Sequence, residues 1–167
     1  MSTSAKARRT QPVKIRFMRE AIRISRQMMR RNHGGPFGAV IVRHGRIIAR
    51  GWNQVTSTND PTAHAEIVAI RRACARLRRF HLNDCEIYTS CEPCPMCLAA
   101  IYWARLKKVY FANTRADAAR IGFDDELIYR EMALPLRRRR LPMEQMLPDE
   151  AARVFAEWLA KPDKTPY

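Results

Sequence analysis

The sequence is poor in glycine, in acidic residues and in long apolar runs. Of its 167 residues, 6 are glycine and 10 are proline, while 47% are hydrophobic. This composition excludes collagen-like, low-complexity and largely disordered chains. No stretch approaches the roughly 18 uninterrupted apolar residues of a membrane span, and residues 1–12 lack the apolar segment of a secretory signal. We therefore expect a cytoplasmic protein without a membrane partner.

Basic residues outnumber acidic ones 31 to 16, which gives a formal net charge of +15 and raises the question of a nucleic-acid partner. Residues 1–31 hold 10 basic residues and 1 acidic residue, so they carry +9 of this charge. Five of the arginines fall on one arc of the predicted first helix, opposite its apolar stripe: Arg16, Arg19, Arg23, Arg26 and Arg30. A solvated helix face explains most of them, so the charge by itself does not specify a nucleic-acid partner.

Hydrophobic periodicity predicts alternating helices and strands. Helices are expected at 14–31, 63–77, 93–103, 124–132 and 148–161, and strands at 37–43, 46–52, 85–90 and 109–112. This order predicts an α/β protein, a three-layer α/β/α sandwich with a mixed central sheet. The length suits one domain. We expect that domain over residues 14–167, after a basic flexible tail over residues 1–13.

Two short motifs carry the chemistry: His64-Ala65-Glu66 and Pro93-Cys94-Pro95-Met96-Cys97. Together they match the H-x-E and P-C-x-x-C pattern of zinc deaminases. Cys94 and Cys97 are about one helical turn apart, so both thiolates can reach one ion, and His64 can supply a third ligand. Three protein ligands leave the fourth tetrahedral position open for a water that becomes acidic. Glu66 lies roughly 200° around an ideal helix from His64, which argues against both residues binding one ion.

The cysteines allow other interpretations. Cys91, Cys94 and Cys97 form a C-x-x-C-x-x-C run that could hold a structural metal or an iron–sulfur centre, with Cys74 or Cys85 as a fourth ligand. A structural zinc module without turnover is a further alternative, although it leaves Glu66 without a role. Packing in the core is the simpler expectation for Cys74, Cys85 and Cys91.

Two stretches, 58–66 and 89–97, resemble the cytidine-deaminase-like superfamily of zinc deaminases. Within it, Gly34-Gly35-Pro36-Phe37-Gly38-Ala39-Val40, Ile101-Tyr102-Trp103-Ala104-Arg105 and Gly122-Phe123-Asp124-Asp125 resemble bacterial guanine deaminases. The likeness extends from about residue 15 to the last residue. A longer basic segment before Ile15 and the run from Arg137 to Arg140 depart from that family and leave partner binding open.

The resemblance implies a zinc-dependent hydrolase that converts guanine to xanthine and ammonia. It implies that His64, Cys94 and Cys97 hold Zn²⁺ and that Glu66 shuttles protons. The other residues that it implicates are Asp125 at the exocyclic amino group, and Asn53, Phe37, the Ala65 backbone, Trp103 and Tyr167 around the purine. It also implies a homodimer whose C-terminal segments are swapped, so that Tyr167 closes over the partner's site.

Each of these contacts also has a simpler explanation. Asn53 can stabilise a turn, Phe37 and Trp103 can be core residues, Asp125 can cap the following helix, and Tyr167 can be a frayed end. The alternative substrates are guanosine, another aminated ring and a tRNA adenosine.

Overall fold

A computed structural model of the chain describes residues 3–166, with side chains from residue 14 onward. It divides into two compact units, Met1–Asp125 and Glu126–Tyr167.

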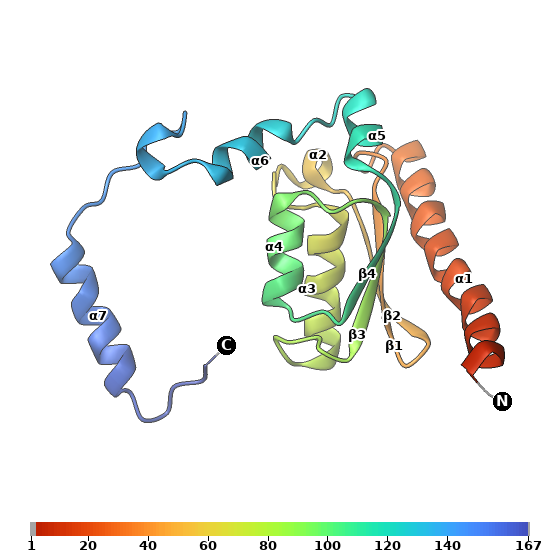
Figure 1. The fold of residues 1–167 in the computed structure, drawn as a ribbon, viewed down its shortest axis with the longest axis horizontal. Helices are drawn as coiled ribbons and strands as arrows, with labels where there is room; N and C mark the ends of the chain where they lie inside the picture. The colour runs from red at the N-terminus through yellow and green to blue at the C-terminus, as the bar shows by residue number, and fades with distance from the viewer. Residues whose placement is uncertain (1–2, 167) are drawn as a thin grey trace. The chain divides into compact units, whose positions relative to one another are not determined.

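The first unit is built on a four-stranded sheet in the order β2-β1-β3-β4 (Figure 1). Its strands are β1 (Gly38–Arg43), β2 (Arg46–Trp52), β3 (Cys85–Cys91) and β4 (Lys108–Asn113). β1 is antiparallel to β2 and β3, whereas β3 and β4 are parallel, which confirms the mixed sheet. His44 and Gly45 both have positive φ, 47° and 71°, as a two-residue turn between right-twisted strands requires.

Helices cover both faces of this sheet, which confirms the three layers (Figure 1). α1 (Thr3–Arg30) lies on one face, and α3 (Ala65–Leu77) and α4 (Pro95–Trp103) lie on the other. α1 begins at Thr3, well before the expected Lys14, so most of residues 1–13 continue the helix.

Two short α-helices were not expected from the sequence. α2 (Val55–Thr58) follows β2, and α5 (Arg115–Arg120) follows β4. α5 begins with a capping box in which Thr114 and Asp117 satisfy each other's backbone N–H groups. Local capping therefore supports a helix that is too short to show hydrophobic periodicity.

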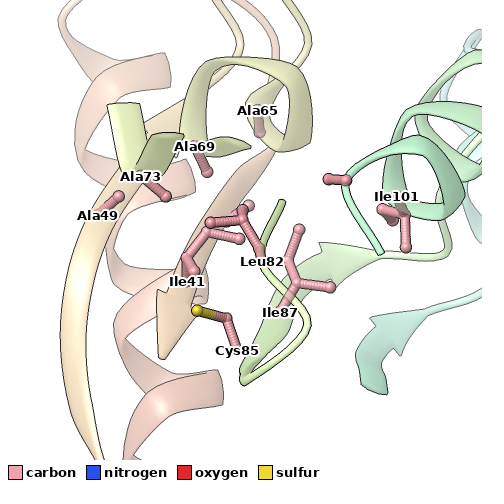
Figure 2. Packing of buried hydrophobic residues seen from close by; sticks show 11 residues of the cluster. Ile41, Ala49, Ala65, Ala69, Ala73, Leu82, Cys85, Ile87 and Ile101 are labelled. Atoms are coloured by element: carbon pink, nitrogen blue, oxygen red, sulfur yellow. The ribbon is translucent and has the colours of Figure 1, made fainter. Parts of the chain in front are cut away.

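The core between the sheet and α3 depends on small side chains. Ala65, Ala69 and Ala73 recur at every fourth residue of α3 and face Ile41 and Ile87 of the sheet, as Figure 2 shows. Because these side chains are short, the helix backbone lies close to the strands. The opposite face of the sheet packs separately against the buried Phe17 and Ile24 of α1.

The described part of the second unit, residues 126–166, has no buried core of its own. It contains α6 (Glu126–Ala133), a short 3₁₀ helix (Leu136–Arg138) and α7 (Pro148–Ala160), and none of its described residues is buried. Large apolar side chains are exposed along α7, among them Phe155 and Leu159. In the part of the chain that the structure describes, no helix is long and apolar enough to cross a membrane.

We predict that Gly51→Ala destabilises the fold and weakens the site together. A Cβ at Gly51 would lie 2.1 Å from the Ala65 carbonyl oxygen and 2.6 Å from the Ala69 nitrogen, and both are backbone atoms that cannot turn aside. We expect the free energy of unfolding to fall by about 3 kcal/mol. Urea denaturation measures this loss, and zinc content after dialysis reports the displacement of the start of α3.

Gly45→Ala is the matched control, because a Cβ at Gly45 meets nothing within 4 Å. It should cost only about 1 kcal/mol, from the left-handed backbone at that turn. Equal losses in the two variants would contradict the close approach of α3 to β2.

Candidate metal centre and active site

Two helices begin at the centre of the predicted site. His64 occupies the N-cap of α3 and Cys94 the N-cap of α4, both with extended backbone dihedrals. Both helices therefore begin about two residues later than the sequence predicted, and Pro95 rather than Pro93 occupies the first turn of α4. Because His64 precedes its helix, the 200° offset expected between it and Glu66 does not apply.

The three predicted metal ligands lie together. The Nδ1 atom of His64 is 3.6 Å from the Sγ atom of Cys94 and 3.5 Å from that of Cys97. The three ligand atoms all lie within 4.8 Å of one another. Nitrogen and sulfur atoms bound to one tetrahedral zinc ion, at about 2.0 and 2.3 Å from it, are separated by about 3.6 Å. The donor set and its spacing therefore fit Zn²⁺.

The cluster also favours the anionic ligand form that a metal needs. Hydrogen bonds from Cys97 and His64 lower the pKa of Cys94 to about 4, and the cysteine lies at a helix N-terminus. The neighbouring Cys94, together with burial, raises the pKa of Cys97. Cys94 in turn raises the pKa of His64. The lowered pKa of Cys94 favours the thiolate form, which is the form that binds a metal cation.

Glu66 reaches this cluster, which the sequence did not determine. Its side chain is buried, with 6% exposed, in the first turn of α3. The thiol of Cys97 donates to Oε2 of Glu66 over 3.5 Å, and the hydroxyl of Thr89 donates to Oε1 over 2.9 Å. Burial raises the pKa of Glu66, against the hydrogen bond from Thr89. A carboxylate beside the metal position, with a pKa above its ordinary value, is suited to accept and return a proton.

Asn53 is buried directly after β2, and its side-chain amide is oriented by the loop around it. Oδ1 accepts hydrogen bonds from the backbone N–H groups of Gly35 and Val55, both at 3.2 Å. Because both partners are N–H donors, the side-chain atom that they contact must be the amide oxygen of Asn53. The Nδ2 group therefore points away from them and can donate a hydrogen bond elsewhere. The loop wraps closely here, because a Cβ at Gly34 would lie 2.1 Å from the Asn53 carbonyl oxygen.

An aromatic pair lies beside this loop. The rings of Phe37 and Phe123 meet edge to face, with centroids 4.9 Å apart. Phe123 is not among the predicted site residues, although it lies in the Gly122–Asp125 stretch that carries part of the family resemblance. Asp125 follows closely, and its pKa is raised by burial and then by the negative charge of Cys94. Asp125 is half-buried at the end of the first unit.

The remaining cysteines lie outside the described metal cluster, so the structure does not support an all-cysteine centre. The thiol of Cys91 donates to the Thr114 carbonyl over 3.6 Å. The thiol of Cys85 is fully buried and donates to Asp84. Both fit the expected packing role.

Three predicted substrate contacts differ in their placement. Ala65 is the first residue of α3 and is fully buried beside Glu66. Trp103 lies at the C-terminal end of α4, the opposite end from Cys94, with 69% of it exposed. Within the first unit, Trp103 therefore lies apart from the other residues predicted to contact the purine. Tyr167 lies outside the described residues.

Comparison with known proteins agrees with this site. The chain is 50% identical to guanine deaminase of Bacillus subtilis over 90% of its own length and 97% of that protein's. The X-ray structure of the same enzyme matches with a TM-score of 0.88, over 90% of this chain and 96% of that one.

More distant relatives share less of the chain. A tRNA-specific adenosine deaminase of Aquifex aeolicus is 42% identical over 58% of this chain and 63% of that protein. A solved protein in complex with 8-azaguanine is 35% identical, with a TM-score of 0.63, over 65% of this chain and 63% of that one.

The cytidine and deoxycytidylate deaminase zinc-binding region matches residues 12–113, which hold the whole His64, Cys94 and Cys97 cluster together with Glu66. With this match and the near-complete alignment to one relative, the chain belongs to the cytidine and deoxycytidylate deaminase zinc-binding family.

Proposed function

We propose that this protein catalyses the hydrolytic deamination of guanine to xanthine and ammonia. The observation that carries the proposal is the placement of the buried Glu66 against the His64, Cys94 and Cys97 cluster. The relative that aligns over nearly the whole chain is a guanine deaminase, which favours guanine as the substrate.

His64, Cys94 and Cys97 hold the metal that the family binds. Zinc bound there supplies Lewis acidity, which lowers the pKa of water toward neutrality. Glu66 accepts a proton from the attacking water and delivers it to the ring nitrogen next to C2. Its burial excludes bulk water from that transfer and keeps the proton within the site.

The residues around the cluster orient the purine. Nδ2 of Asn53 donates to a ring acceptor, because Oδ1 is already occupied by two backbone donors. Phe37 and Phe123 flank the base with apolar surface. Asp125 accepts from the exocyclic amino group. With Asp125 assisting, Glu66 then takes the proton of the new C2 hydroxyl and gives it to the amino group, so the C2–N bond breaks and ammonia leaves.

We propose a homodimer in which the C-terminal segment is exchanged between subunits and Tyr167 closes over the site. The second unit supports this, since its described residues bury no side chain and expose Phe155, Trp158 and Leu159 along α7. Apolar surface of this kind needs a covering partner. We also place the protein in the cytoplasm, where the ligand thiols remain reduced.

Ammonia release from a panel of aminated rings tests the proposed activity. Zinc-loaded protein should release ammonia and xanthine from guanine faster than it releases ammonia from guanosine or cytosine. Incubation with tRNA, followed by analysis for inosine, tests the alternative that the protein deaminates a tRNA adenosine. Stoichiometric zinc with no ammonia from any ring would overturn the proposal, and inosine formation without guanine turnover would favour the RNA-acting alternative.

Glu66→Gln should retain zinc and lose turnover. The amide keeps the volume of the side chain but cannot accept a proton, so we expect kcat to fall by about 10³-fold or more. Zinc content by atomic absorption should stay at one per chain. Glu92→Gln, outside the cluster, is the matched control and should change kcat little; near-normal turnover in the Glu66 variant would contradict its role.

Asn53→Ala should weaken guanine binding and turnover. The change removes the Nδ2 donor and leaves the N–H groups of Gly35 and Val55 without their acceptor, so the loop loosens as well. We expect kcat/KM to fall by about 10²-fold. This corresponds to the free energy lost when a hydrogen bond is removed and its buried partner is left unpaired. Steady-state kinetics measure it, and Asn59→Ala, on the nearby loop, is the control whose kinetics should stay close to wild type.

A further inference from the structure

We propose that Thr89 is a positioning residue for Glu66: its hydroxyl holds one carboxylate oxygen so that the other faces the metal cluster. This inference rests on the proposed function, since it concerns the proton acceptor of that reaction. Thr89 belongs to neither of the two sequence motifs that carry the metal ligands.

The position of Thr89 in the sheet explains how it reaches Glu66. Side chains along β3 alternate between the two faces, and Cys85, Ile87 and Thr89 share the face that packs against α3. Cys85 and Ile87 are apolar members of that core. At the third position of the row a hydroxyl takes the place of an apolar side chain, with 1% of Thr89 exposed.

Because of the hydrogen bond from Thr89, the two oxygens of the Glu66 carboxylate have different partners. Oε1 of Glu66 accepts from the Thr89 hydroxyl at 2.9 Å, a normal length for this bond. Oε2 lies 3.5 Å from Sγ of Cys97, one of the three ligand atoms of the cluster. Fixing Oε1 to a strand in the middle of the sheet therefore fixes the direction of Oε2.

The strand itself is held rigidly at this point. Thr89 is paired with Ala39 of β1 and with Phe111 of β4, so it lies in an inner strand with a neighbour on each side. The adjacent Ser90 lies on the opposite face of β3, where its buried hydroxyl accepts from the Gly38 N–H at 3.0 Å without contacting Glu66. The Thr89 hydroxyl is therefore held more rigidly than the longer side chain of Glu66. A rigid donor of this kind can fix the orientation of a flexible acceptor.

Thr89→Val is the test, because valine keeps the β-branched shape and removes only the hydroxyl. We expect kcat for guanine to fall about 10- to 100-fold, the range seen when a partner that orients an active-site group is removed. KM and zinc content should change less than about twofold, since the Thr89 hydroxyl is bound to Glu66 and Thr89 is not one of the three residues of the metal cluster. Thr89→Ser, which restores the hydroxyl, should recover most of kcat.

Ser90→Ala is the matched control, because it removes a buried hydroxyl from the next residue, on the other face of β3. It should lower Tm by an amount comparable to Thr89→Val and leave kcat within about twofold of wild type. In a Glu66→Gln background, Thr89→Val should cause no further loss of turnover, because the residue through which it acts is already disabled.

A readout that does not use turnover separates this inference from the proposed function. The crystal structure of the Thr89→Val variant should show the Glu66 carboxylate rotated away from its wild-type position, with the zinc ligands unmoved. If the wild type fails to deaminate guanine, that structure still decides whether Thr89 orients Glu66. An unmoved carboxylate, a kcat within twofold of wild type, or a Thr89→Ser variant as impaired as Thr89→Val would each overturn the inference.

Discussion

The convergence of two helix N-termini on one point is the constraint on which the site depends. His64 and Cys94 each occupy an N-cap, so two helices direct their unpaired N–H groups toward the ligand cluster. This positive potential, with the hydrogen bonds around Cys94, favours the thiolate that a cation requires. Bringing the start of α3 this close to the sheet requires a residue without a side chain at Gly51 and short side chains along the helix.

The same close packing creates the environment of Glu66. An isolated carboxylate at 6% exposure would be strongly destabilised, and here a hydroxyl and a thiol contact its two oxygens. The protein therefore gives up some stability to bury an acid whose pKa is raised above its ordinary value. A direct hydrogen bond to an inner strand limits the cost and orients the group.

The two units differ in how they are stabilised. Residues before Glu126 form two separate cores on the faces of one sheet, whereas the described residues that follow bury none of their apolar side chains. An amphipathic helix such as α7 gains most of its stability from burying its apolar face, so this unit is incomplete by itself. The prediction of one domain over 14–167 rests on chain length and on the lack of a flexible linker, and it stays a prediction.

The sequence by itself determined the layered α/β class, the elements of the sheet and the three ligand positions, because hydrophobic periodicity and motif spacing are local properties. It missed α5, whose stability comes from a capping box, and it placed the starts of α3 and α4 too early, because N-cap geometry is not visible in spacing. Only the tertiary structure decided that Glu66 faces the cluster, that Thr89 holds it, and that Phe123 pairs with Phe37. These contacts join segments 23 or more positions apart along the chain, and such distances are set by packing of the sheet against its helices rather than by local sequence.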